Sequence, residues 1–88
     1  MKIEIIEMDR APKLPKVTQL WRQRGYDSVY MRVDDRQGKR ALGFDTGHDL
    51  SFFSVGMADG RVYQASKDMT NIEILEPVDD VLRVIAVK

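Results

Sequence analysis

Short runs rich in β-branched and aromatic residues, several of them alternating between apolar and polar positions, cover most of the chain and predict β-strands. In residues 2–8, for example, Ile3 and Ile5 alternate with Glu4. Residues 81–87 are also expected to form a strand, although the acidic residues before them leave a helix as the alternative. The predicted strands are residues 2–8, 26–33, 39–44, 50–58, 61–66, 71–76 and 81–87.

A first hairpin is predicted around residues 35–39, where Gly38 fits the left-handed bulge position of a three-residue loop. Opposite charges then face each other near the loop, which favours this register. The register pairs Asp35 with Lys39, Asp34 with Arg40, Arg32 with Leu42 and Tyr30 with Phe44. One face of the hairpin would therefore carry aromatic, aliphatic and basic side chains together.

A second hairpin is predicted around Asp59–Gly60, a dipeptide typical of a type I′ turn. This turn places Met57 opposite Val62. Residues 77–80 are expected to turn the chain before its last strand, because a proline and two aspartates gather there.

One short helix is predicted near residues 16–24. Apolar residues recur there at helical spacing, at Val17, Leu20 and Trp21. Pro15 suits the first helical position and Gly25 suits the left-handed residue after the last turn. No residue with a good N-cap side chain precedes this segment.

These elements predict a mainly β (α+β) fold, a small antiparallel barrel or half-barrel of about six to seven strands with one short helix near residues 16–24. The alternative is a four- or five-stranded sheet with helices on one face. The chain has 88 residues and no low-complexity or Gly/Ser-rich stretch. We therefore expect residues 1–88 to form a single compact domain.

The composition excludes several kinds of chemistry. The chain contains no cysteine, which excludes disulfides, thiolate metal sites and a cysteine nucleophile. His48 is the one histidine, which argues against a zinc site built from histidines of a single chain. We expect no metal and no cofactor. Fourteen basic and fourteen acidic residues give a formal net charge of zero, which argues against a simple polycation that coats nucleic acid.

No complete catalytic motif is present. Residues 44–47, Phe-Asp-Thr-Gly, resemble the catalytic loop of retroviral-type aspartic proteases, in which two chains each supply one aspartate. The sequence continues with His48 where that family usually has alanine, and Glu76 stands where its second element has glycine. The Gly-x-Ser-x-Gly motif of serine hydrolases is also absent. We therefore expect a protein that is not an enzyme.

The zero net charge hides an uneven distribution. Residues 10–40 contain nine Lys or Arg and three Asp or Glu, a net charge of +6, whereas residues 45–88 carry a net charge of −4. Trp21 and Tyr30 lie within the basic segment. Tryptophan, tyrosine and arginine are common anchors of protein interfaces, and the same residue types also bind phosphates and stacked bases.

We therefore expect a small protein-interaction module, such as an adaptor, inhibitor or regulatory subunit, that binds a protein partner through a mixed aromatic and basic face. The alternative is a nucleic-acid-binding β-barrel that uses the basic residues 10–40. The split charge is also compatible with a homodimer. The candidate partner-binding residues are Trp21, Arg22, Arg24, Tyr30, Arg32, Arg40, Leu42 and Phe44.

The sequence gives no sign of a membrane segment. The first ten residues, MKIEIIEMDR, place acidic residues among isoleucines and do not resemble a signal peptide. No stretch of about twenty apolar residues is present. We expect no membrane partner and a cytoplasmic location.

Overall fold

The computed structural model describes residues 2–5, 14–43 and 50–87, which form seven strands and one helix. The elements are β1 (Lys2–Ile5), β2 (Leu20–Gln23), β3 (Val29–Val33), α1 (Asp35–Leu42), β4 (Ser51–Gly56), β5 (Val62–Ser66), β6 (Ile72–Val78) and β7 (Val81–Val87). The predicted mainly β fold with one short helix is confirmed.

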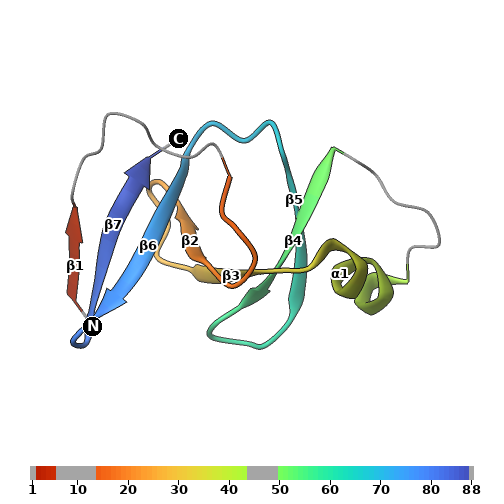
Figure 1. The fold of residues 1–88 in the computed structure, drawn as a ribbon, viewed down its shortest axis with the longest axis horizontal. Coiled ribbons are helices and arrows are strands. Elements are labelled where there is room, and N and C mark those ends of the chain that lie inside the picture. The colour runs from red at the N-terminus through yellow and green to blue at the C-terminus, as the bar shows by residue number, and fades with distance from the viewer. Residues whose placement is uncertain (1, 6–13, 44–49, 88) are drawn as a thin grey trace.

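The strands form one sheet that is open like a half-barrel. Their order is β1-β7-β6-β2-β3-β4-β5, with β1 parallel to β7 and every other neighbouring pair antiparallel. In Figure 1 the blue β6 and β7 lie on one side, β4 and β5 lie on the other, and β2 and β3 cross between them. Because β1 and β5, at the two ends of the order, do not pair, the described sheet does not close.

Apolar side chains are buried on both faces of this sheet, because successive strand residues point to opposite faces. One cluster consists of Trp21, Phe52, Ile72, Ile74 and Ala86. A second cluster consists of Leu75, Leu82 and Val84. Leu20 packs against the second cluster although its neighbour Trp21 belongs to the first. The strand β2 thus joins the two apolar layers.

The helix predicted near residues 16–24 is not formed, and residues 20–23 of this segment form β2 instead. Thr18 has a φ of 74°, which does not fit an α-helix. The main chain of β2 pairs instead with β3 on one side and β6 on the other. The helical spacing did not predict the correct element, because Leu20 and Trp21 are apolar for a different reason. Each of them packs with a separate apolar cluster, and the two clusters lie on opposite faces of the sheet.

The first predicted hairpin is also absent, because residues 35–42 form α1. The Asp34 side chain accepts a hydrogen bond from the main-chain N of Arg36 at 2.7 Å and caps the helix start. Gly43, with φ of 78°, ends the helix in the left-handed conformation. The pairs predicted between residues 30–35 and 39–44 therefore do not form in the described part of the chain.

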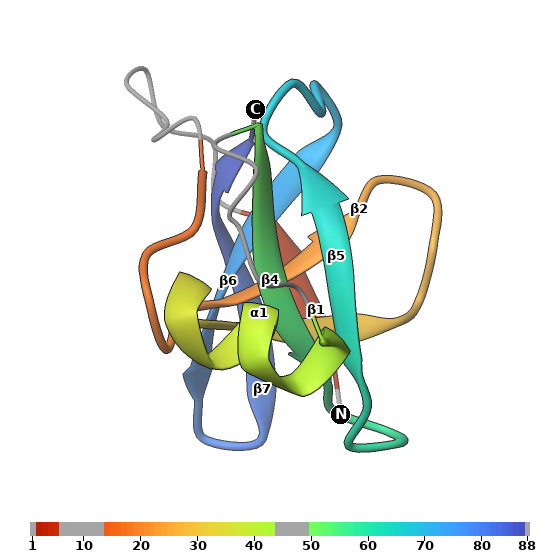
Figure 2. The same cartoon turned by 90° about the vertical axis from the view of Figure 1, so that its right-hand side faces the viewer.

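Helix α1 lies across β4 and beside β5, as Figure 2 shows. Its one buried residue is Gly38, which lies against the side chain of Phe53. A Cβ atom at position 38 would overlap the Cβ and Cγ atoms of Phe53. Gly38 thus serves close packing between a helix and a strand, not the bulge of a hairpin loop.

The second predicted hairpin is present, formed by β4 and β5, with a register two residues away from the expected one. Val55 lies opposite Val62, and the Asp59 side chain accepts a hydrogen bond from the main-chain N of Arg61 at 3.0 Å within a wider turn. Because the shift is two residues, each side chain stays on its predicted face.

The remaining predicted strands are present where they are described, although β3 begins only at Val29, and Pro77 and Val78, expected in the turn, pair with β7 as the end of β6. Residues 81–87 form a strand, which excludes the helix alternative, and Asp79 and Asp80 turn the chain before it with φ values of 47° and 64°. The predicted first strand is present over residues 2–5. Its last residues, and Phe44 with the Asp-Thr-Gly string, lie outside the described residues.

Candidate functional site

Four aromatic side chains form a row that runs from the core to the open edge of the sheet. The Trp21 ring stacks on Tyr30 with a centroid distance of 4.9 Å, and Phe52 meets Trp21 edge-on at 5.3 Å. On the other side, the Tyr63 ring meets Tyr30 edge-on at 5.5 Å. Phe52 is fully buried whereas Tyr63 is 39% exposed, so exposure to solvent increases along the row from Phe52 to Tyr63.

The strand register accounts for this row. Trp21 lies opposite Tyr30 across β2 and β3, and Tyr30 lies opposite Gly56 across β3 and β4. A Cβ atom at position 56 would lie 3.0 Å from the Cε2 atom of Tyr63. The missing side chain of Gly56 therefore leaves the space that the Tyr63 ring uses.

Hydrogen bonds anchor two of the four rings, those of Trp21 and Tyr63. The indole Nε1 of Trp21 donates to the Oγ atom of Ser54 at 2.8 Å in the buried interior. The hydroxyl of Tyr63 donates to the carboxylate of Asp59 at the surface. Both bonds fix the orientation of the ring, because the N–H or O–H group of the side chain is held by its hydrogen-bond acceptor.

The surface bond shifts two pKa values. The hydrogen bond from the Tyr63 hydroxyl is the main cause that lowers the pKa of Asp59 below its ordinary value, followed by the bond from the main-chain N of Arg61. The same bond to Asp59 is the main cause that raises the pKa of Tyr63. The pair is therefore held as an ionised carboxylate and a neutral phenol at neutral pH.

A depression of about 380 Å³ lies over the exposed end of the row, and we call it the aromatic depression. None of the described residues that line it is charged. Its lining residues are Trp21, Gln23, Tyr30, Tyr63, Gln64, Ala65, Ser66 and Met69. Because β5 supplies half of this lining, the depression lies directly beside the edge strand.

The outer edge of β5 carries main-chain groups that do not bond to β4. Ladder bonds flank the strand, with Gly56 N donating to Arg61 O at 2.8 Å and Lys67 N donating to Leu50 O at 2.9 Å. Because bonded pairs alternate along an antiparallel ladder, Tyr63 and Ala65 also face β4. Val62 and Gln64 therefore direct their N–H and C=O groups outward, and none of the described strands pairs with this edge.

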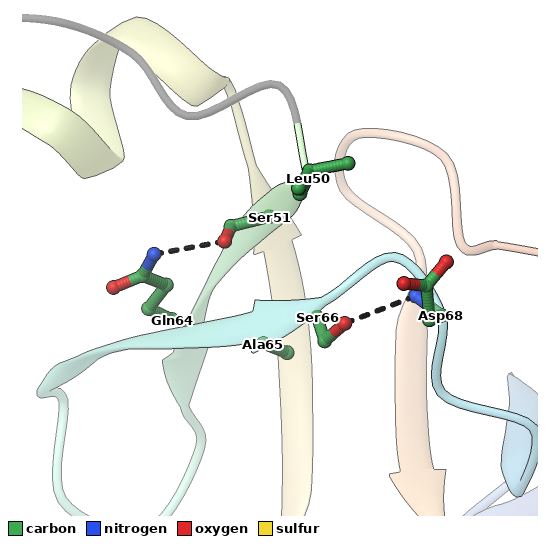
Figure 3. Close-up of a pocket in the computed structure, with 6 residues that line it drawn as sticks. All are labelled: Leu50, Ser51, Gln64, Ala65, Ser66 and Asp68. Atoms are coloured by element: carbon green, nitrogen blue, oxygen red, sulfur yellow. Dashed lines mark hydrogen bonds between the residues drawn. The ribbon is translucent and has the colours of Figure 1, made fainter.

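A second depression of about 380 Å³ lies beside the same strand and is shown in Figure 3. We call it the serine depression. Gln64 Nε2 donates to Ser51 Oγ at 2.8 Å, and the main-chain N of Asp68 donates to Ser66 Oγ at 3.1 Å. Its lining residues are Leu50, Ser51, Gln64, Ala65, Ser66 and Asp68. Figure 3 shows Ser51 and Gln64 at one end of it and Ser66 and Asp68 at the other.

Of the candidate residues selected from the sequence, Trp21 and Tyr30 come together in the aromatic depression. Arg32 is held inside the protein instead. Its Nη1 donates to the main-chain O of Pro15 at 2.6 Å, its Nη2 lies 3.5 Å from the carboxylate of Asp35, and its guanidinium lies 5.3 Å from the Phe52 ring centroid. With 16% of its side chain exposed, Arg32 is largely occupied by internal contacts.

The other basic candidates are dispersed. Arg22 points to the face opposite Trp21, and its Nε lies 2.7 Å from a carboxylate oxygen of the buried Glu73. Arg24 contacts the other oxygen of Glu73 at 3.4 Å, although 59% of its side chain is exposed. Arg40 and Leu42 are exposed on α1, and Phe44 lies outside the described residues. The mixed face expected from the first hairpin is therefore not assembled.

Apart from Trp21 and Tyr30, the residues that line the two depressions are not candidates from the sequence, and these include Tyr63, Gln64 and Met69. The alternation in residues 61–66 does predict the strand that carries two of them. It does not show that this strand lies at the edge of the sheet, since that depends on the pairing of all the strands. A tyrosine just after the Asp59–Gly60 turn was the available signal.

Comparisons with protein-family models, with curated proteins and with solved structures found no match. Within residues 2–5, 14–43 and 50–87, no three His, Cys, Asp or Glu side chains are grouped so that they could hold a metal ion. The same residues contain no helix long and apolar enough to cross a membrane. The candidate site therefore rests on the geometry around β5.

Proposed function

We propose that the protein is a non-enzymatic interaction module that binds an extended segment of a partner protein as an additional strand on β5. The observation that carries this proposal is the aromatic depression beside the outward main-chain groups of Val62 and Gln64. Strand addition takes its affinity from main-chain hydrogen bonds and its specificity from pockets for alternate side chains. The five residues of β5 offer both.

The sequence of β5 supports this use of the edge. Proteins commonly protect edge strands from pairing with charged residues, prolines or bulges. β5 reads Val-Tyr-Gln-Ala-Ser, contains neither charge nor proline, and pairs with β4 in an unbroken register. The other edge strand, β1, includes Lys2 and Glu4 among its four residues. The contrast favours β5 as the edge that accepts a partner.

A random peptide library displayed on phage supplies the probe for the first test, and selected peptides are synthesised and titrated into the full chain. Binding is expected to slow amide hydrogen exchange at Val62, Gln64 and Ser66, whose N–H groups face away from β4. Selected peptides that protect other amides and leave β5 unchanged would contradict the proposal, as would a selection that yields no binder.

A matched pair of variants provides the second test. Gln64→Pro removes an outward N–H, and proline is tolerated in edge strands at positions where the N–H faces solvent. Gln64→Ala keeps that N–H and removes the side-chain bond to Ser51. We expect Gln64→Pro to weaken peptide binding by about tenfold or more, which corresponds to one lost hydrogen bond and the bulk of the ring. Equal binding by the two variants would contradict strand addition.

A second candidate function, nucleic-acid binding, is favoured by one observation on α1. Arg36, Lys39 and Arg40 are spaced along one side of this helix, and no carboxylate of the described residues forms an ion pair with them. Titration with single-stranded and duplex oligonucleotides at two salt concentrations tests this function. Binding through several phosphates must weaken steeply as salt rises, and absent binding at low salt excludes it.

A further inference from the structure

The two depressions share the strand β5, and the side chains of Tyr63 and Ser51, one from each depression, lie on opposite faces of the sheet. Gln64, Ala65 and Ser66 line both of them. Tyr63 contributes to the aromatic depression, whereas Ser51 contributes to the serine depression from the opposite face. The strand β5 therefore lies between two depressions that differ in their chemistry.

The aromatic depression fits an apolar or aromatic side chain. The stacked rings of Trp21 and Tyr30 line it together with Tyr63 and Met69. Aromatic rings and methionine sulfur favour contact with another ring. A volume of about 380 Å³ is at the small end of ligand pockets and suits one or two side chains of a bound segment.

The serine depression has a different preference. Among the described residues, Asp68 is the one charged residue that lines either depression, and the side chains of Ser51, Gln64 and Ser66 add hydroxyl and amide groups. A carboxylate attracts a basic side chain and repels an acidic one. The hydroxyl and amide oxygens can accept hydrogen bonds from the same basic group.

Building on the proposed strand addition, we infer that the segment bound by β5 alternates apolar or aromatic residues with basic residues. Successive side chains of an added strand point to opposite faces of the sheet. Residues opposite Tyr63 and Ala65 therefore extend over the aromatic depression, and residues opposite Gln64 and Ser66 extend over the serine depression. The partner is an extended peptide in which every second residue is apolar and those between are basic.

A second copy of β5 matches this pattern less well. Its sequence alternates apolar and polar residues but contains no basic residue. The carboxylate of Asp68 in the serine depression therefore favours the basic peptide over a second copy of β5 as the occupant.

Three end-capped hexapeptides test the pattern by nitrogen-15 NMR titration of the full chain. The first alternates tyrosine and lysine, the second has three tyrosines followed by three lysines, and the third alternates tyrosine and glutamate. We expect the first peptide to bind about tenfold more tightly than either of the others, a difference of about 1.4 kcal/mol. The shifts should be largest at Val62, Gln64 and Ser66.

A matched pair of charge variants tests the role of Asp68. Asp68→Asn should weaken binding of the tyrosine–lysine peptide by about threefold or more, because it removes the facing carboxylate. Asp80→Asn makes the same charge change in the turn between β6 and β7, where asparagine tolerates the positive φ. Equal effects of the two variants would overturn the assignment of Asp68.

The outcomes separate this inference from the function on which it rests. Equal affinities for the three peptides, with shifts centred on β5, would overturn the alternating pattern and leave strand addition standing. Absence of β5 shifts with every peptide would reject both. A dimer in sedimentation equilibrium that protects the β5 amides without peptide would identify a second copy as the occupant and overturn the inference.

Discussion

Replacing Gly38 with alanine is expected to destabilise the fold, although alanine favours a helix more than glycine does. The added Cβ would overlap the Cβ and Cγ atoms of the fully buried Phe53. The position of the Phe53 Cβ atom is fixed by the main chain of β4, so it cannot rotate away and α1 must move outward. Overpacking costs about 3 kcal/mol at the upper end of its range. The higher helix propensity of alanine stabilises the helix by about 1 kcal/mol. The free energy of unfolding is therefore expected to fall by about 2 kcal/mol in total.

Urea unfolding followed by the fluorescence of the buried Trp21 measures this loss. For a domain of this size, 2 kcal/mol corresponds to a Tm lower by about 8–16 °C. Gln37→Ala is the matched control, because Gln37 is exposed on the same helix and gains the preference of alanine without a clash. If Gly38→Ala were as stable as Gln37→Ala, the close contact between α1 and Phe53 would be refuted.

Two further predictions concern the hydrogen bonds that anchor the aromatic row. Ser54→Ala leaves the buried indole N–H of Trp21 without its partner, and should lower the free energy of unfolding by about 1–3 kcal/mol, measured with urea; an unchanged midpoint would contradict that role. Tyr63→Phe should raise the pKa of Asp59 toward its ordinary value, measured by carboxyl carbon NMR. Because folding lowers this pKa, the stabilisation is present above the ordinary pKa of aspartate and is lost as pH falls through the folded value.

The strands were largely predictable because their apolar residues repeat along the chain, and the one helix was not. Asp34 and Gly43 are good start and stop signals for α1, and both were present in the sequence. Gly38 supported a hairpin loop equally well, since glycine serves left-handed turns and close packing alike. The deciding residue is Phe53, which lies in β4, far from Gly38 in the sequence. Its side chain leaves no room for a Cβ atom at position 38 of α1.

The candidate site was predictable only in part. Trp21 and Tyr30 were selected for their chemistry, and the register of β2 and β3 does stack them. Tyr63 joins them through β4, which separates β3 from β5 in the sheet. No local pattern indicates that β5 is the last strand, because an edge is defined by the absence of a further neighbour.

The basic residues show why a count of charge does not locate a binding surface. Segment 10–40 has a net charge of +6, yet Arg22 and Arg32 are tied to Glu73 and Asp35 and are mostly buried. An ion pair inside a protein removes the long-range field of both partners and leaves less charge for a ligand. The acidic second half of the chain supplies Glu73, so part of the charge split between the halves is used within the fold. The strand β5 itself carries no charged residue. Recognition of a bound segment there depends on main-chain groups and on the side chains of the two depressions.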